Sequence, residues 1–452
     1  MSDPRILATR ILERVLFEEA YSHLALDQAL QRTPLDDRDA ALCTTLVYGT
    51  LTWLRRLDAE LKPLINRDLD GLDRPVLLSL RMALYQIIFL DRVPEHAAVD
   101  RAVEISKKRC GRGASGFTNG VLRNWLRKRK STPIWKAIDP DREPTRYLGV
   151  RYSLPDWLAT YLLDQSDFPR AEARAAALTK QAPLYLRLTD AALAERSDHE
   201  VLDISEPVEA MPLTRRAATL SAPIRQALQS GDVVIQDLGS QLITEIATRA
   251  ITESSPKVLD ACAGLGGKTL YLAQRLGPQA TIAAVDPHRS KLDALMETAD
   301  TTGFSDQITP HESTLGAAKP SNGGHDLVLV DAPCTGLGVI RRHPETRWRR
   351  SPDDIADRSA LQTGLLAEAA AHVAPGAHLM YSVCTFTDEE GPQVIDQFLA
   401  DHPDFERCDP RNYLPDPYRR AVTDQDMVRL DPADFDCDAF FGALLRRTPD
   451  DS

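Results

Sequence analysis

The sequence predicts a multidomain protein with an all-α N-terminal domain, a small α+β linker module and a C-terminal domain built on a mainly parallel α/β sheet. Three observations support this prediction. Apolar residues recur at helical spacing through residues 4–138, prolines punctuate residues 139–230, and strand-like and helix-like segments alternate from about residue 256 onward. We therefore expect domains at residues 1–138, 139–230 and 231–448.

Composition and charge limit the possible classes of protein. The chain has 452 residues, 43% hydrophobic and 27% charged, as expected for a globular protein. Its formal net charge of −12 argues against generic nucleic-acid binding, although local patches matter more than the total. The seven cysteines form no C-x-x-C pair and no Cys/His zinc spacing, so we expect reduced thiols in a cytoplasmic protein and no metal site. The N-terminus lacks a signal-peptide pattern, and the longest apolar stretch, residues 75–90, is too short to span a bilayer.

The helical domain ends in a strongly basic region. Residues 105–138 contain ten Lys or Arg and no acid, and Trp125 and Trp135 lie among the cations. The cations are Lys107, Lys108, Arg109, Arg112, Arg123, Arg127, Lys128, Arg129, Lys130 and Lys136. Such a run is often a solvated helix face, but in an acidic chain it favours a surface for a polyanion, which gives phosphate affinity without sequence readout.

The linker module and the α/β domain are read from their local patterns. In the module we expect helices at residues 147–163 and 171–180 and strands at residues 184–188 and 233–237. In the α/β domain the strand candidates are residues 257–261, 281–286, 307–311, 326–331, 378–383 and 440–445, with helical patterns between the first five. That alternation is typical of a sheet covered on both faces.

A glycine-rich turn opens the α/β domain. Residues 257–269 read as a buried strand, a turn with Gly264, Gly266 and Gly267, and the start of a helix. The next strand ends in Asp286, 22 residues after Gly264, close to the spacing at which an acid meets ribose hydroxyls. The same pattern also fits a tight turn with a solvated Asp. A triphosphate-binding loop is disfavoured, because position 262 is Cys where that motif requires Gly.

Two cysteines and an acid follow the fourth and fifth predicted strands. The fourth strand runs into Asp331 and Cys334, and the fifth ends at Cys384. The ligand crevice of an open α/β sheet lies beyond these strand ends. A single cysteine there is most often a small core residue, but two beside an acid indicate a catalytic role for at least one thiol.

A thiolate in such a crevice is suited to conjugate addition. Attack at C6 of an unstacked cytosine turns C5 into a nucleophile able to accept a methyl group, and an acid that hydrogen-bonds N3 stabilises the charge the ring gains. Spacing alone does not decide which thiol attacks. Between the cysteines, residues 340–350 hold five arginines and one Trp, which we interpret as a loop that contacts phosphates and bases rather than a solvated loop.

Further motifs lie near these residues and in the helical domain. They are Asp331-Ala-Pro-Cys334, Arg342-His-Pro344, Trp348 and Tyr381-Ser-Val-Cys384, together with residues 46–49, 93–99 and 117–123. Jointly they resemble the Sun/Fmu (RsmB-type) group of ribosomal RNA cytosine-5 methyltransferases, over nearly the whole chain. The resemblance implies a NusB-like RNA-binding domain followed, after the linker module, by a Rossmann-like methyltransferase domain.

The resemblance also implies an activity and a set of site residues. The activity is methylation of C5 of a cytosine in small-subunit (16S) ribosomal RNA, with S-adenosyl-L-methionine as cofactor and a covalent Cys–C6 adduct. By this match Cys384 is the nucleophile, Cys334 helps the β-elimination that frees the product, and Asp331 and Lys268 complete the catalytic residues. The expected cofactor site consists of Cys262, Ala263, Gly264, Leu265, Gly266, Gly267, Lys268, the ribose-binding Asp286, Glu312 on the adenine side, and Asp331. We expect a monomer without membrane contact.

The chain departs from the pattern of that group at several positions. Gly264-Leu265 replaces Ala-Pro in the turn, and Glu312 stands where Asp is usual. Val383-Cys-Thr385 replaces Thr-Cys-Ser, Gly391 replaces an Asn after a pair of acids, and Asp438-Ala-Phe-Phe441 stands for Asp-Gly-Phe-Phe. Both thiols and Asp331 are present, so we expect activity, with cofactor affinity and the target base as the properties that these changes affect.

Two other functions compete with this prediction. The chain could be a non-catalytic RNA-binding or ribosome assembly factor with a vestigial methyltransferase fold, in which the helical domain and the basic run act alone. It could also be a DNA cytosine methyltransferase, which would use a single Pro-Cys thiol. The second cysteine and the RNA-binding-like helical domain argue against the DNA enzyme.

Overall fold

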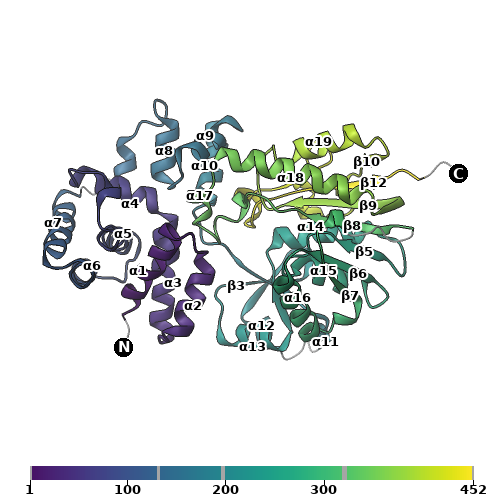
Figure 1. Cartoon of the computed structure of the whole chain (residues 1–452), viewed down its shortest axis with the longest axis horizontal. Helices are drawn as coiled ribbons and strands as arrows, with labels where there is room; N and C mark the ends of the chain where they lie inside the picture. Colours follow the sequence, from purple (N-terminus) through teal and green to yellow (C-terminus); the bar gives the residue numbers. More distant parts are fainter. Residues whose placement is uncertain (1–2, 130–132, 195–198, 318–322, 450–452) are drawn as a thin grey trace. The chain divides into compact units, whose positions relative to one another are not determined.

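The computed structural model describes residues 3–129, 133–194, 199–317 and 323–449. The chain divides into two compact units (Figure 1). Unit 1 comprises residues 1–181 and 340–350, and unit 2 comprises residues 182–339 and 351–452. Residues 340–350 thus belong to unit 1, although their neighbours in the sequence belong to unit 2. Among the described residues, no helix is both long and apolar enough to cross a bilayer.

Unit 1 is helical, as the periodicity predicts. Its helices are α1 (Pro4–Phe17), α2 (Ser22–Arg32), α3 (Asp37–Thr52), α4 (Leu54–Leu61), α5 (Arg74–Phe89), α6 (Glu95–Cys110), α7 (Arg112–Lys128), α8 (Pro144–Arg151), α9 (Asp156–Asp164), α10 (Phe168–Ala177) and the short α17 (Thr346–Arg349). Helix α5 is the centre of this unit: it is buried on every side from Val76 to Gln86 and packs against α1, α3, α4, α6 and α7 (Figure 1). A helix that is apolar all round is stable only in such a position.

The single helix predicted at residues 147–163 is wrong. Helix α8 ends at Arg151 and α9 begins at Asp156. Between them Ser153 adopts a positive φ of 53° and Pro155 precedes the first residue of α9. Proline disfavours helical geometry in the residue before it, so the apolar pattern continues across a break in the backbone.

Unit 2 begins with a small antiparallel sheet of order β2-β3-β1-β4. Its strands are β1 (Leu184–Leu188), β2 (Ser205–Val208), β3 (Met211–Ala217) and β4 (Val233–Ile235), and its helices are α11 (Asp190–Ala194), α12 (Glu200–Asp203) and α13 (Ala222–Ser230). Strands β1 and β4 match two predicted strands. The predicted linker module, residues 139–230, is divided, because residues up to 181 belong to unit 1 and the rest to unit 2.

The main sheet of unit 2 has the order β10-β12-β9-β8-β5-β6-β7, with β11 paired to β12. The strands are β5 (Lys257–Asp260), β6 (Thr281–Asp286), β7 (Ile308–Glu312), β8 (His325–Asp331), β9 (Val373–Val383), β10 (Phe405–Arg407), β11 (Val428–Leu430) and β12 (Phe440–Arg447). From β7 to β9 all neighbours are parallel, and β10, β11 and β12 pair antiparallel. The six strands predicted from the sequence are confirmed; β10 and β11 are three residues each and were not predicted.

Helices cover both faces of the main sheet. They are α14 (Leu238–Arg249), α15 (Gly267–Leu276), α16 (Arg289–Thr302), α18 (Pro352–Ala370), α19 (Pro392–Asp401) and the short α20 (Pro432–Phe435). Successive strand residues point to opposite faces: Leu327 and Leu329 pack with α14, α15 and α16, whereas Val328 and Val330 pack with α18 and α19. This two-sided burial explains the uninterrupted apolar runs of the parallel strands.

Candidate active site

The predicted site residues lie at the carboxyl ends of β5, β6, β7, β8 and β9. The turn 262–268 follows β5, Asp286 ends β6, Asp331 ends β8, and Cys384 follows β9. The strand order reverses between β5 and β8, since the chain continues from β5 to β6 and β7 on one side and returns to β8 on the other. Ligands of open α/β sheets bind at such a switch point. The fold therefore gathers these residues at one edge of the main sheet of unit 2.

The glycine turn is held against the neighbouring strand. Gly264 and Gly266 adopt positive φ angles of 55° and 84°. A Cβ on Gly266 would lie 2.4 Å from Leu295 Cγ, so only glycine fits there. The backbone N–H of Gly264 donates to Asp286 Oδ2 at 3.1 Å, and that of Ala263 donates to Val285 O at 2.9 Å. The turn is thus fixed in place without the proline that the Sun/Fmu pattern has at position 265.

The acids beside the turn are suited to a nucleoside ligand. Asp286 is buried and also accepts a hydrogen bond from the backbone N–H of His288 at 2.8 Å. Glu312, exposed at the end of β7, is in register with Asp286 on the adjacent strand. A Cβ on Gly267 would meet nothing within 4 Å, so there is open space over the turn. This combination of an open, glycine-lined backbone and an acid at the next strand end fits the adenosyl part of S-adenosylmethionine.

Lys268, Asp331 and Ser382 form a chain of polar contacts at this edge of the sheet. Lys268 Nζ lies 2.6 Å from Asp331 Oδ2, and Ser382 Oγ donates to Asp331 Oδ1 at 2.8 Å. Lys268 is buried, and its Nζ is 5.0 Å from the centre of the Phe440 ring. Both oxygens of Asp331 are therefore oriented by neighbours, which fixes a carboxylate at the floor of the site.

The two predicted thiols are in contact. Cys334 Sγ and Cys384 Sγ are 3.2 Å apart. The hydrogen bond with Cys384 and the loss of surrounding water raise the pKa of Cys334 well above its ordinary value. Cys334 is consequently a neutral thiol at pH 7, whereas the attacking sulfur must be a thiolate. The raised pKa argues against Cys334 as the attacking thiolate.

A buried carboxylate that the sequence analysis did not assign holds both cysteine loops. Glu390 is fully buried, and its oxygens accept from Thr335 N at 2.7 Å, Thr335 Oγ1 at 2.6 Å, Gln362 Nε2 at 3.1 Å and Thr387 Oγ1 at 2.8 Å. Thr335 follows Cys334 directly. The only available signal in the sequence was the Glu389-Glu390 pair shortly after Cys384, which does not reveal that one of the two acids points inward.

Asp260, at the end of β5, gives the first testable prediction. It is buried, Thr269 Oγ1 donates to its Oδ2 at 2.6 Å, and burial raises its pKa from 3.8 to about 6. The folded state therefore keeps a proton that the unfolded chain releases above about pH 4. A pKa difference of about two implies that stability from this group falls by about 2–3 kcal/mol as the pH rises from about 4 to 6.

The measurement compares wild type with Asp260→Asn by urea unfolding between pH 4 and 7. As the pH rises over that window, we expect the unfolding free energy of the wild type to fall by about 2–3 kcal/mol relative to that of the variant. Asp293→Asn, at an exposed position, serves as the control. Its unfolding free energy should differ from that of the wild type by the same amount at every pH. A constant difference for Asp260→Asn as well would show that this carboxyl is ionised throughout.

The interpretation of residues 340–350 as a phosphate- and base-contacting loop is wrong for Arg341 and Arg347, which are buried. Arg347 is completely buried and donates to the backbone carbonyls of Leu178 at 3.1 Å and Ile340 at 3.3 Å. Trp348 Nε1 donates to Leu51 O at 2.7 Å, and Arg341 is buried as well. Arg347 and Trp348 therefore serve the packing of unit 1, because they satisfy buried carbonyls at helix ends and loops.

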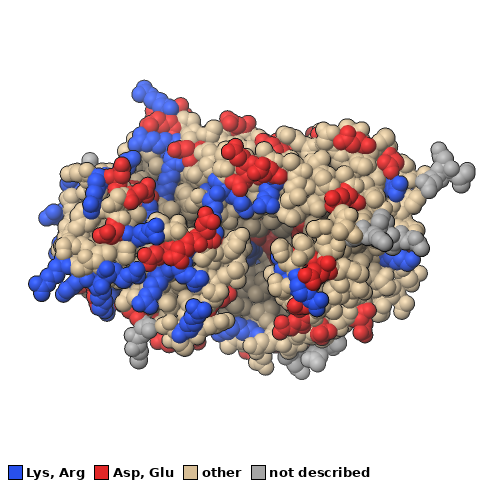
Figure 2. Space-filling model, in the orientation of Figure 1, with Lys and Arg blue, Asp and Glu red and all other residues tan. Residues whose placement is uncertain are grey.

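In the basic run of residues 105–138 the described cations are exposed, whereas the ring of Trp125 is buried. Its nine described cations are all exposed, and Lys130 lies outside the described residues. Figure 2 shows Lys and Arg side chains gathered over α6 and α7, with acids among them. Three of the cations pair with acids: Lys108 with Glu104, Arg109 with Glu13 and Arg129 with Glu95. Trp125 is buried and donates to Glu60, so it is not available to stack on a base. The polyanion surface remains a prediction that rests on the cations alone.

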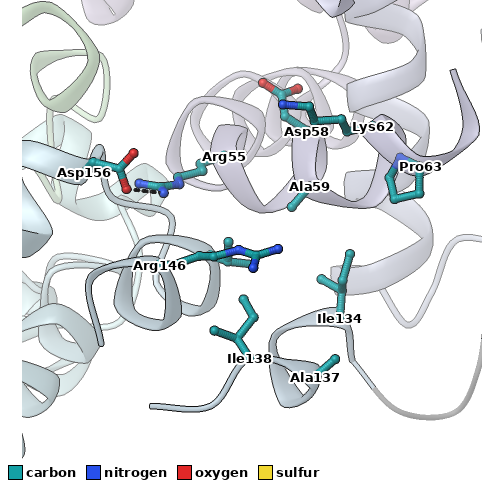
Figure 3. A pocket seen from close by; sticks show the side chains of 11 residues that line it. Arg55, Asp58, Ala59, Lys62, Pro63, Ile134, Ala137, Ile138, Arg146 and Asp156 are labelled. Carbon is teal, nitrogen blue, oxygen red and sulfur yellow. Dashed lines mark hydrogen bonds and ion pairs between the residues drawn. The ribbon is translucent and has the colours of Figure 1, made fainter. Parts of the chain in front are cut away.

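A pocket of about 580 Å³ in unit 1 contains none of the predicted site residues. It lies between α4, α8 and residues 134–138 (Figure 3). Four of its charged side chains are already paired: Arg55 with Asp156, Asp58 with Arg81 and Arg146 with Glu143. We assign it no function.

Two families match the chain. Residues 250–446 match the family described as 16S rRNA methyltransferase RsmB/F, and residues 2–127 match the NusB family. The chain is 35% identical over 454 residues to the probable ribosomal RNA small subunit methyltransferase B of Bacillus subtilis, with 98% of each protein covered. It is 35% identical over 405 residues to ribosomal RNA small subunit methyltransferase B of Thermus thermophilus, with 89% of this chain and 88% of that protein covered.

Solved structures share the fold at lower identity. PH0851 aligns with a TM-score of 0.79 at 22% identity and covers 99% of both chains. NSun6 from Pyrococcus horikoshii with SFG aligns with a TM-score of 0.56 at 16% identity, over 66% of this chain and 99% of that one. At these identities the likeness supports the fold alone.

Proposed function

The chain belongs to the RsmB/F family of 16S rRNA methyltransferases, and we propose that it transfers a methyl group from S-adenosylmethionine to C5 of a cytosine in small-subunit ribosomal RNA through a covalent Cys384–C6 adduct. The observation that supports this chemistry most directly is the pair of thiols 3.2 Å apart at the ends of β8 and β9, beside Asp331. A methyltransferase acting on an already nucleophilic atom needs no such pair.

The reaction begins with the thiolate of Cys384. Its attack on C6 forms the S–C6 bond and moves an electron pair into the ring, so that C5 becomes nucleophilic and negative charge builds up on the ring. In this proposal the Asp331 side chain, oriented by Ser382 and Lys268, donates a hydrogen bond to N3, and the Lys268 ammonium is a nearby positive charge. The bound cofactor supplies the electrophilic methyl group that C5 accepts.

Release needs a base for the C5 proton. Removal of that proton restores the C5–C6 double bond and expels the Cys384 sulfur by β-elimination. Cys334, in contact with Cys384, is positioned to take part in this step. In this proposal Cys334 passes its own proton to the departing Cys384 sulfur and takes the C5 proton in exchange, so it stays a neutral thiol throughout and does not compete for C6.

The cofactor contacts follow from the glycine turn. In this proposal residues 262–268 lie along the adenosyl group, Asp286 accepts from the ribose hydroxyls, and Glu312 lies on the adenine side. Ribosomal RNA would contact the NusB-like helices of unit 1 through the exposed cations of α6 and α7. Such contacts give salt-dependent affinity, while the crevice of unit 2 provides the choice of base.

The test of the function is a methyl-transfer assay. The purified protein is incubated with methyl-labelled S-adenosylmethionine and small-subunit ribosomal RNA, both naked and in the ribosomal particle, and the RNA is digested to nucleosides. We expect labelled 5-methylcytosine. RNA binding without cofactor binding in calorimetry would instead identify an assembly factor with a vestigial fold. Label transfer to DNA but not to RNA would identify a DNA enzyme.

Asp286→Ala gives a prediction for cofactor binding. The substitution removes an acceptor for the ribose and releases the N–H of Gly264, so we expect the dissociation constant for S-adenosylmethionine to rise about 10- to 100-fold, as for the loss of a charged hydrogen bond. Asp293→Ala, an exposed position on α16, is the matched control and should leave it unchanged. Equal affinities by calorimetry would remove Asp286 from the cofactor site.

A further inference from the structure

Two histidines and a glutamate converge inside unit 1, whereas the residues of the proposed methyl-transfer chemistry belong to unit 2. His23 lies in the first turn of α2, and His343 and Glu345 lie in the segment 340–350, which packs within the same unit. One ligand atom of each side chain lies within 4.8 Å of the others. The two imidazole rings meet edge to face, with centroids 5.1 Å apart.

The polar atoms of this group are only partly satisfied. Glu345 is 1% exposed. Its Oε1 accepts from the backbone N–H of Ser22 at 3.0 Å, which caps the start of α2. Its Oε2, the Nδ1 of His23 and the Nδ1 of His343 are all buried without a hydrogen-bond partner among the described residues.

Capping of α2 does not account for this arrangement. The cap uses only Oε1 of Glu345. It gives no role to Oε2 or to the Nδ1 atoms of His23 and His343. A buried carboxylate is costly unless a cation or enough hydrogen bonds compensate its charge. Among the described residues no ion pair to Glu345 within 4.0 Å is found. A cation placed between the three side chains would satisfy Oε2 and one nitrogen of each ring at once.

We propose that His23, His343 and Glu345 bind a zinc ion. Two imidazole nitrogens and one carboxylate oxygen are a donor set that Zn²⁺ accepts, with water as a fourth ligand, whereas Mg²⁺ and Ca²⁺ prefer oxygen atoms alone. A pocket of about 540 Å³, lined by Glu345, Trp348 and Arg349 among others, borders the group at Glu345.

The ion would join two distant parts of the chain within unit 1. His23 and His343 are separated by 320 positions in the sequence. The metal would therefore fasten the segment 340–350 to the start of α2, next to the hydrogen bonds from Arg349 to the carbonyls of Val15 and Ala20. Because it binds the folded protein and not the unfolded chain, zinc would raise the unfolding temperature.

The experiment must separate this site from the two thiols of unit 2, which also attract zinc. The full-length Cys334→Ser/Cys384→Ser protein is stripped of metal and titrated with Zn²⁺ against a chromophoric chelator. We expect one tight site per chain. Adding His23→Gln or His343→Gln should weaken it about a hundredfold or more, because each removes a direct ligand. Adding His96→Gln, an exposed histidine on α6 of the same unit, should leave it unchanged.

A second readout reports the ligand atoms themselves. Co²⁺ bound to the Cys334→Ser/Cys384→Ser protein should give visible d–d bands that disappear when His23→Gln is added and that carry no thiolate-to-cobalt charge-transfer band. His23 is the preferred position, because it is half-exposed and its replacement preserves the hydrogen bond from Glu345 to α2. The proposal is overturned if the Cys334→Ser/Cys384→Ser protein binds no zinc, or binds it equally with and without His23 and His343.

Discussion

Cys384→Ala abolishes methyl transfer, with an expected loss on the order of a thousandfold or more in turnover. Without the attack on C6, C5 of cytosine is not nucleophilic enough to accept a methyl group, and the neutral thiol of Cys334 does not replace the missing thiolate. The measurement is labelled 5-methylcytosine formed per enzyme under single-turnover conditions. Cofactor affinity should remain at the wild-type level, since Cys384 does not belong to the turn that follows β5.

Cys334→Ala distinguishes the roles of the two thiols, because it should trap a covalent protein–RNA complex that Cys384→Ala cannot form. If Cys334 acts in release, this variant forms the S–C6 bond but eliminates it slowly, so a protein–RNA complex that survives denaturing electrophoresis should accumulate. Cys384→Ala should give no such complex. Cys408→Ala, a half-buried thiol beside β10, is the matched control and should behave as wild type. The reverse pattern, with the complex in Cys384→Ala alone, would exchange the two roles.

Glu390→Ala should have the largest effect on stability, a loss of about 3–5 kcal/mol. The substitution leaves the N–H of Thr335, two threonine hydroxyls and the amide of Gln362 without their acceptor in a fully buried place. The loop that carries Cys334 loses its attachment at the same time, so turnover should fall even where the protein remains folded. Urea unfolding of the full chain measures the first effect and the methyl-transfer assay the second.

Two companion variants make this prediction specific. Glu390→Gln keeps one acceptor oxygen and should recover part of the stability. Glu406→Ala, an exposed glutamate on β10, should change the unfolding free energy by less than about 0.5 kcal/mol. If Glu390→Ala were as stable as Glu406→Ala, the buried network would not be what holds the cysteine loops.

The main sheet could be predicted because its physical signal is local. Parallel strands that are buried on both faces must be apolar over their whole length, and the glycine turn after β5 requires residues that tolerate positive φ and a close neighbour. The three-residue strands β10 and β11 have no such signal. The break between α8 and α9 was missed because the apolar period passes through Pro155 unchanged.

The charged residues were harder to interpret, because their type does not reveal their surroundings. Arg347 looked like a ligand for phosphate and proved to be a buried donor to backbone carbonyls. Trp125 looked like a partner for bases and proved to be core. An arginine or tryptophan has the same side chain in either role, and only the neighbours brought in by the fold distinguish them.

By itself the sequence determined the element types, the glycine turn and the two thiols at strand ends, because each depends on residues close together in the chain. The tertiary structure alone decided that the thiols touch, that Glu390 holds both their loops, and that residues 340–350 pack in unit 1 with His343 and Glu345 facing His23. Those contacts join residues tens to hundreds of positions apart, and burial then sets the charge and hydrogen bonding of each group.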